Sequence, residues 1–316
     1  MKAIFFGTPK IAAVILKQLI QAKIEIVAVV TQPDKPKGRG KEVAVSEVKE
    51  VALSFGLPIY QPQKVKEESF IQQLKEKNPD IILVAAYGKI LPSSILTLPH
   101  YGCLNVHASL LPKYRGASPI QWAILNGEKV SGVTIMYMDE GLDTGDILLK
   151  KEILLDSKET AQSLHDKLAD LGGKALLEVL VSIEKGEAKR IPQSKDGVVY
   201  VGTIEKSFGW IDFNRSAIEL ERFVRGLNPW PSAYTKWNGK SLKFWDTDFV
   251  FSKDFPSLYK DSPNGTVVFI DKEHFWVQCG EGFLQVNELQ LEGKRRMCCE
   301  EFLRGYSLTV GTKLGE

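Results

Sequence analysis

Three polar side chains from two places in the sequence could together carry a transfer reaction. Asn105 and His107 lie two positions apart at the end of the apolar run 102–106, so on a β-strand both side chains point to the same face. Asp143 lies between Gly141 and Gly145, and these glycines favour a tight loop that can bring a carboxylate close to a substrate. An amide, an imidazole and a carboxylate can stabilise an oxyanion and move a proton.

Each of these residues also has a structural interpretation. A single histidine in an apolar strand is more often a satisfied core residue than a catalyst, and the Asp143 loop could be an Asx turn with Asp146 beginning a strand. The letters Asp-Thr-Gly at 143–145 also occur in aspartic proteases, which need two copies of them in an all-β fold. This sequence has one copy among alternating strands and helices, which argues against a protease.

Several common active-site motifs do not occur in the sequence. A G-x-S-x-G nucleophile motif, a P-loop and H-E-x-x-H are all missing. Only Gly7 stands where a dinucleotide fingerprint needs three glycines, so Gly7-Thr8-Pro9 is interpreted as a turn into a helix. The four cysteines lack the spacing of a zinc site: Cys103, Cys279, Cys298 and Cys299. We therefore expect the polar residues to act without a protein nucleophile and without a metal.

A cationic loop follows the second expected strand. Its four basic residues lie close together, with glycines on both sides of the arginine: Lys35, Lys37, Arg39 and Lys41. The whole chain has 41 basic and 39 acidic residues and a net charge of +2, so bulk charge does not indicate a nucleic-acid partner and a local patch would have to bind one. The loop is either a clamp for a phosphate backbone or a solvated surface loop.

The first half of the chain alternates between the periodicities of strands and helices. Short apolar strands are expected at 3–6, 24–30, 58–60, 81–85 and 102–106. Helices are expected between them at 11–20, 43–55 and 67–77. This alternation predicts an α/β fold with a Rossmann-like, mostly parallel sheet. Such sheets bind ligands at the carboxyl ends of their strands, which is where Asn105 and His107 fall.

The second half has a different pattern. Two strands and a long helix follow, at 133–138, 146–155 and 159–184. Further on, short strand-like runs separated by turns, with a helix near 217–227, predict a small β-barrel domain that is OB-like. Three parts are therefore expected, a catalytic domain, a linker and a barrel domain, at 1–188, 189–203 and 204–316.

The composition is that of an ordinary soluble globular protein. Of the 316 residues, 44% are hydrophobic and 25% are charged. The longest strongly apolar run, 81–87, is far shorter than the roughly 20 residues of a membrane helix, and the first residues lack the apolar core of a signal peptide. Few cysteines suit a reducing compartment. We expect a cytoplasmic monomer with no membrane partner.

The polar residues belong to longer motifs that resemble a known family. Asn105-x-His107 is followed by Ser109-Leu110-Leu111-Pro112-x-Tyr114-Arg115-Gly116 and then by Asp143-Thr144-Gly145. These motifs resemble the folate-dependent formyltransferase family. The resemblance implies 10-formyltetrahydrofolate as the co-substrate and an amine as the formyl acceptor. It also implies a folate pocket lined by Ser109, Leu110, Leu111 and Pro112.

The resemblance implies a role for each polar residue. Asn105 would donate a hydrogen bond to the oxyanion that forms on the formyl group, and His107 would be a second donor that delivers a proton to the leaving N10 atom. Because a carboxylate is a weak base at neutral pH, Asp143 is assigned to hold His107 or an ordered water in position, with proton acceptance as an option.

Two further stretches resemble the branch of the family that formylates methionyl initiator tRNA. The stretch 31–41 resembles its tRNA-contacting loop, and Leu227-Asn228-Pro229-Trp230-Pro231 resembles a motif of its C-terminal domain. The implied partner is initiator methionyl-tRNA, and the product would be N-formylmethionyl-tRNA for translation initiation. The length of the chain agrees with this branch.

Two features depart from that branch. Ser232 stands where the family usually has glycine, and residues 201–316 carry 15 basic and 16 acidic side chains, 15 − 16 = −1. A broadly cationic C-terminal surface is therefore not expected, and individual candidates for tRNA contact are Lys206, Arg215, Lys294, Arg295 and Arg296. Two alternatives stay open: a UDP-aminosugar formyltransferase, and a catalytically inactive tRNA-binding protein on the same fold.

Overall fold

Five parallel strands make up one side of the first sheet, and two antiparallel strands make up the other. The computed structural model describes residues 1–37, 42–251 and 262–315, and within them this sheet has the order β10-β9-β7-β6-β1-β2-β5. The parallel strands are β1 (Lys2–Gly7), β2 (Glu25–Val30), β5 (Ile59–Tyr60), β6 (Ile81–Ala85) and β7 (Cys103–His107). The antiparallel strands β9 (Val130–Tyr137) and β10 (Ile147–Leu154) complete it.

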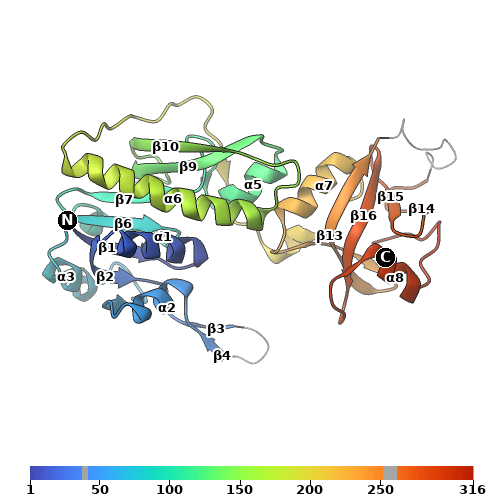
Figure 1. Ribbon diagram of the computed structural model, residues 1–316, viewed down its shortest axis with the longest axis horizontal. Helices are drawn as coiled ribbons and strands as arrows, with labels where there is room; N and C mark the ends of the chain where they lie inside the picture. Colours follow the sequence, from blue (N-terminus) through green and yellow to red (C-terminus); the bar gives the residue numbers. More distant parts are fainter. Residues whose placement is uncertain (38–41, 252–261, 316) are drawn as a thin grey trace. The chain divides into compact units, whose positions relative to one another are not determined.

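Helices cover both faces of this sheet (Figure 1). They are α1 (Lys10–Gln21), α2 (Glu47–Ser54), α3 (Glu68–Glu76), α4 (Ser93–Leu96) and α6 (Ala161–Glu184). Ile4 and Phe6 of β1 pack in one cluster with Phe70 and Leu74 of α3. On the opposite face α1 and α6 lie side by side, where Lys10 pairs with Asp166. Burial on both faces explains the continuous apolar runs of the parallel strands.

The turn after β1 is tightly packed. A Cβ atom at Gly7 would lie 2.6 Å from Ala12 Cβ and 2.8 Å from Phe5 Cε1, and Pro9 is the N-cap of α1. Close approach of the strand and the helix therefore explains this glycine, as the interpretation of Gly7-Thr8-Pro9 as a turn predicted.

The helix expected at 43–55 is shorter than predicted. A small hairpin precedes it, in which β3 (Lys35–Lys37) pairs with β4 (Glu42–Ala44). Ser46 then caps α2, because its side chain accepts a hydrogen bond from the backbone N–H of Lys49. The strand pairing and the cap together move the start of the helix to Glu47.

The second sheet is antiparallel. It has the order β12-β13-β16-β15-β14, with β17 paired to β16. Its strands are β12 (Ala233–Trp237), β13 (Lys240–Val250), β14 (Val267–Ile270), β15 (Phe275–Gln278), β16 (Phe283–Leu291) and β17 (Met297–Cys298). The helical elements around it are α5 (Pro119–Leu125), η1 (Lys206–Gly209), α7 (Ala217–Gly226) and α8 (Cys299–Gly305).

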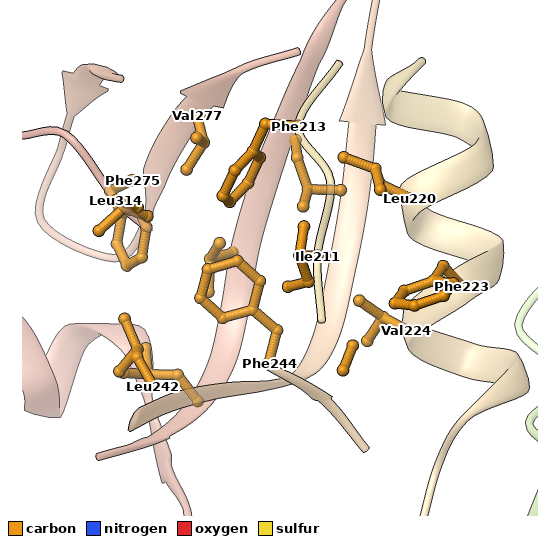
Figure 2. Close-up of a cluster of buried hydrophobic side chains, with 14 of the residues drawn as sticks. Ile211, Phe213, Leu220, Phe223, Val224, Leu242, Phe244, Phe275, Val277 and Leu314 are labelled. Carbon is orange, nitrogen blue, oxygen red and sulfur yellow. The ribbon is translucent and has the colours of Figure 1, made fainter. Parts of the chain in front are cut away.

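The last described residues connect the two edges of this sheet. At the β14 edge, Val267 N donates to Thr312 O at 2.8 Å, and at the β12 edge Gly315 N donates to Lys236 O at 2.9 Å. The sheet is therefore closed into a barrel-like ring. Its core is filled by large apolar side chains of the strands, of α7 and of the turn before α7, among them Phe213, Phe223, Phe244 and Phe275 (Figure 2).

The chain divides into two compact units. The first contains Met1–Pro119, Val130–Leu154 and His165–Val201, and the second contains Ile120–Lys129, Leu155–Leu164 and the chain from Gly202 onward. The boundaries predicted at 1–188, 189–203 and 204–316 differ from this division. Most of the expected linker lies with the first unit, because Ile191 forms a bridge with Ile147 and β11 (Tyr200–Val201) pairs with β8 (Arg115–Gly116). An irregular sequence pattern did not reveal these pairings.

The start of α7 allows a stability prediction. Ser216 caps this helix by accepting a hydrogen bond from Glu219 N, and the Glu219 carboxylate accepts one from Ser216 N. Replacing Ser216 with alanine should destabilise the protein by about 0.5–2 kcal/mol in urea unfolding at neutral pH. The hydrogen bonds from Ser216 lower the pKa of the Glu219 carboxyl. The loss should therefore shrink as the pH falls through that pKa and the carboxylate becomes protonated; a loss independent of pH would contradict this account.

Candidate active site

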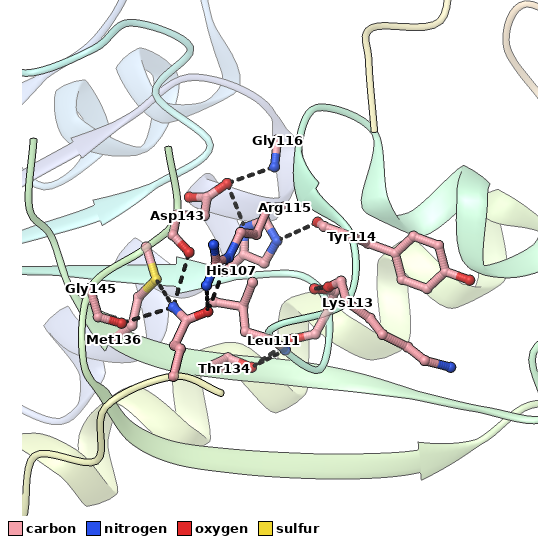
Figure 3. Close-up of polar contacts among 12 residues, drawn as sticks. His107, Leu111, Lys113, Tyr114, Arg115, Gly116, Thr134, Met136, Asp143 and Gly145 are labelled. Carbon is pink, nitrogen blue, oxygen red and sulfur yellow. Dashed lines mark hydrogen bonds and ion pairs between the residues drawn. The ribbon is translucent and has the colours of Figure 1, made fainter. Parts of the chain in front are cut away.

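The imidazole of His107 faces the carboxylate of Asp143. His107 ends β7, and its Nε2 lies 2.9 Å from the backbone oxygen of Tyr114. Since a carbonyl oxygen only accepts, Nε2 carries a proton and donates it. The other ring nitrogen, Nδ1, lies 3.7 Å from Asp143 Oδ2, and the two side chains are only 7% and 14% exposed. The carboxylate thus faces the ring nitrogen that does not bond to Tyr114 O (Figure 3).

The Asp143 carboxylate is held by the backbone of another segment. Gly116 N donates a hydrogen bond to Asp143 Oδ2 at 2.8 Å. Asp143 itself has a φ of 54°, in the left-handed region that aspartate tolerates better than most residues. The side chain therefore reaches back from its loop to the strand β8, which lies beside His107 in this unit.

Asn105 shares the face of β7 with His107. Strand pairing fixes its backbone on both sides. Asn105 pairs with Val84 of β6 on one side and with Met136 of β9 on the other. The side chain is half-buried, and no residue in the described part of the chain forms a side-chain hydrogen bond with it. Asn105 thus lies near the carboxyl end of a parallel strand, as the strand pattern predicted, and its amide has no side-chain partner among the described residues.

The loop after β7 is held by its own hydrogen bonds. Thr134 Oγ1 donates to Ser109 O at 2.7 Å and accepts from Leu111 N at 3.1 Å, and Ser109 Oγ donates to Lys113 O at 2.6 Å. Ser109 and Leu111 are buried, whereas Leu110 and Pro112 are half-buried. Of the four residues expected to line a folate pocket, Leu110 and Pro112 are therefore the more accessible.

Gln193 connects the side chain of Arg115 to the backbone of the Asp143 loop. Gln193 Nε2 donates to the backbone oxygens of Asp143 and Gly145, at 2.9 and 2.8 Å. Its Oε1 accepts from Arg115, whose Nη1 also donates to the hydroxyl of Tyr200 at 3.1 Å. Arg115 stood in the family motif, but Gln193 lay in the expected linker, where no periodicity or motif marked it.

The expected tRNA loop is only partly described. Lys35 and Lys37 lie in β3, whereas Arg39 and Lys41 lie outside the described residues. Just before β3, Asp34 pairs with Lys49 and accepts from Gln61 Nε2 at 2.7 Å. These two hydrogen bonds, that from Lys49 first, hold the pKa of the Asp34 carboxyl below its ordinary value. The residue before the expected tRNA loop, Asp34, is therefore held in place by Lys49 and Gln61.

Several C-terminal candidates for tRNA contact are paired with acidic side chains. Arg296 pairs with Glu288, Arg295 with Glu301, and Arg215 lies 3.5 Å from Glu219. Lys206 belongs to η1 and Lys294 precedes the arginine pair. These local pairs agree with the slightly negative charge of residues 201–316.

The described residues include neither a candidate metal site nor a candidate membrane helix. They contain no group of three or more His, Cys, Asp or Glu side chains that could hold a metal ion. None of the helices there combines the length and the apolar character that crossing a bilayer requires.

Comparison with known proteins identifies relatives along the whole chain. Residues 1–180 match the family described as formyl transferase, and residues 203–307 match the formyl transferase C-terminal domain. A methionyl-tRNA formyltransferase from Lachnospira eligens is 50% identical over 316 residues, and one from Clostridioides difficile is 47% identical over 315 residues; each match covers 100% of both chains.

Two solved structures with a similar fold were determined with a folate present. WlaRD, a sugar 3N-formyl transferase crystallised with dTDP and 5-N-formyl-THF, matches with a TM-score of 0.65 and 20% identity, over 93% of this chain and 99% of that one. HypX from Aquifex aeolicus in complex with tetrahydrofolic acid matches with a TM-score of 0.64 and 16% identity, over 96% of this chain and 47% of that one. At these identities the two structures show the fold alone. The domain matches and the full-length relatives confirm the resemblance found in the sequence: the chain belongs to the formyl transferase family.

Proposed function

We propose that the chain transfers a formyl group from 10-formyltetrahydrofolate to the free amino group of methionyl initiator tRNA, giving N-formylmethionyl-tRNA for translation initiation in the cytoplasm. The observation that carries this proposal is the identity of 50% and 47%, over whole chains, to two methionyl-tRNA formyltransferases. The approach of His107 to Asp143, beside the open amide of Asn105, supports it. We further propose that the chain acts as a monomer.

The acceptor supplies the nucleophile in this reaction, so the chain needs no serine or cysteine for attack. An α-amino group is partly protonated at neutral pH, so the site has to bind the free amine and take up a proton after attack. Attack on the formyl carbon turns the carbonyl oxygen into an oxyanion. The Asn105 amide is a neutral donor for that oxygen, and such preorganised donors make a large contribution to catalysis.

His107 and Asp143 are assigned to the proton transfers. Because His107 Nε2 donates to Tyr114 O, Nδ1 is the ring nitrogen that we assign to proton delivery to the leaving N10 atom. Asp143, whose Oδ2 lies 3.7 Å from Nδ1, is assigned to holding the imidazole or an ordered water in position for this step. The same carboxylate can accept the proton of the attacking amine through a water molecule.

The residues of the loop after β7 fit a folate in part. Leu110 and Pro112 offer half-buried apolar surface for a pterin ring. Ser109 and Leu111 are buried and bonded to Thr134 or Lys113, so we assign them to holding the loop in shape rather than to direct contact. 10-Formyltetrahydrofolate supplies the activated one-carbon unit when it is bound.

One assay tests the proposal against both alternatives. The purified chain is supplied with 10-formyltetrahydrofolate and either initiator methionyl-tRNA or a UDP-aminosugar, and the formylated product is quantified. We expect formylation of the aminoacylated tRNA alone. Formylation of the sugar alone would make the chain an aminosugar formyltransferase. No turnover on either acceptor, together with tight tRNA binding in a separate binding measurement, would make it an inactive tRNA-binding protein.

A single substitution tests the cationic loop as the tRNA contact. Arg39→Ala should raise the KM for methionyl-tRNA far more than the KM for the folate, because a phosphate contact is lost. The slope of tRNA affinity against salt concentration should also fall by about one contact. Lys17→Ala, at an exposed residue of α1, is the matched control for loss of one positive charge. An unchanged tRNA KM in Arg39→Ala would make the loop solvated surface.

A further inference from the structure

The amide of Gln193 connects a buried arginine to the loop that carries Asp143. Its Nε2 donates to Asp143 O at 2.9 Å and to Gly145 O at 2.8 Å, and its Oε1 accepts from Arg115 Nε at 3.1 Å and Nη2 at 2.7 Å. We propose that Gln193 is a positioning residue for formyl transfer, which holds the Asp143 loop so that its carboxylate faces His107. This inference rests on the proposed function.

The Asp143 loop depends on contacts from outside itself. Within the loop, the Asp139 carboxylate accepts hydrogen bonds from Gly141 N and from the Thr144 hydroxyl. These bonds tie the start of the loop to the Thr144 side chain, but they do not involve the backbone oxygens of Asp143 and Gly145. The backbone at Asp143 has a φ of 54°, a conformation that persists where the surroundings hold it. Gln193 donates hydrogen bonds to the backbone oxygens on either side of Thr144, and these two bonds are positioned to hold this conformation.

The orientation of the Gln193 amide is set by its partners. Arg115 is 8% exposed, and among the described residues its side-chain hydrogen bonds go to neutral oxygens, Gln193 Oε1 and the Tyr200 hydroxyl. The cationic guanidinium therefore requires the amide oxygen on its side. The NH2 group is then directed at the two loop carbonyls, since turning the amide around would place donors against donors and acceptors against acceptors.

The same segment also holds the partner of the carboxylate. Tyr200 and Val201 pair in parallel with Arg115 and Gly116, and Gly116 N is the donor to Asp143 Oδ2. Gln193 thus fixes the backbone of the Asp143 loop, while the β8–β11 pairing fixes the donor to its side chain. Residues expected as a linker therefore hold Asp143 at both its backbone and its carboxylate.

Two variants of Gln193 distinguish positioning of the loop from support of Arg115. Gln193→Ala removes both sets of hydrogen bonds. Gln193→Glu keeps an acceptor for Arg115 but turns an oxygen toward two carbonyl oxygens that lie 2.8 and 2.9 Å from the present donor. Both variants should lower kcat by about 10- to 100-fold, as misplacement of a reacting group does, with little change in either KM. Ser194→Ala, at an exposed neighbour in the same segment, is the matched control and should keep the kcat of the wild type.

The outcomes decide between the two roles. If Gln193→Glu keeps the kcat of the wild type while Gln193→Ala loses it, the residue only supports Arg115 and the inference is overturned. It is equally overturned if both variants keep kcat, or if they raise the KM for the folate and leave kcat unchanged. A fall in kcat with both KM values maintained supports the inference.

Hydrogen exchange gives a readout that does not require activity. Amides of residues 139–146 and of Gly116 should exchange faster in Gln193→Ala than in the wild type, while the strands of the sheet keep their protection. If the wild type transfers no formyl group, the proposed function fails, and exchange alone then tests whether Gln193 holds the loop. If the amides of residues 139–146 and of Gly116 exchange in Gln193→Ala as they do in the wild type, Gln193 does not hold the loop.

Discussion

Replacing Asn105 with alanine should lower kcat by roughly 10²- to 10³-fold, the usual effect of losing one preorganised donor to an oxyanion. The substitution removes an amide that is half-buried and unpaired with the described residues, while β7 keeps its backbone pairing with β6 and β9. Folding should therefore be preserved. Steady-state kinetics of formyl transfer, with circular dichroism as a check of folding, measures the effect.

A neighbour of Asn105 on the same strand gives the matched control. Val106 points to the opposite face, where its side chain packs closely against Gly172 of α6. Val106→Ala should lower the free energy of unfolding by creating space in the core, yet leave kcat nearly unchanged. A folded Asn105→Ala protein with the turnover of the wild type would remove Asn105 from the mechanism.

The α/β fold class was predictable because it depends on patterns within short segments. Continuous apolar runs such as 81–85 indicated strands buried on both faces, and they are confirmed as members of a mostly parallel sheet. β12 and α8 were not predicted, because these short elements gain their stability from packing in the barrel. Pairing between distant segments, such as β8 with β11, leaves no periodicity in either sequence.

The local features of the site were predictable from the sequence, whereas the contacts between its distant segments were not. The spacing of Asn105 and His107 placed both on one face of a strand, and glycines marked the Asp143 loop. Their approach to one another depends on the antiparallel pairing of β7 with β9, which the sequence alone does not display. Gln193 could not be found because a glutamine in an irregular segment is common, and its partners are backbone oxygens that carry no sequence signal.

Replacing Asp143 with asparagine should lower kcat by roughly 10²-fold or more, since a positioned proton-transfer group commonly contributes that much. The side-chain oxygen of asparagine can still accept the hydrogen bond from Gly116 N that Asp143 accepts at 2.8 Å. The loop should therefore keep its place while the charge that faces His107 Nδ1 is lost. Kinetics over a range of pH, with both KM values, measures the effect.

Two comparisons show whether Asp143 acts through His107. Asp139→Asn removes an exposed carboxylate from the same loop, one that bonds only Gly141 and Thr144 among the described residues, and should leave kcat far less affected than Asp143→Asn. Residues that act as one unit have non-additive effects. A double variant, Asp143→Asn with His107→Gln, should therefore lose little more than the more damaging of its single variants. Losses that multiply would mean that the carboxylate and the imidazole, although 3.7 Å apart, serve separate steps.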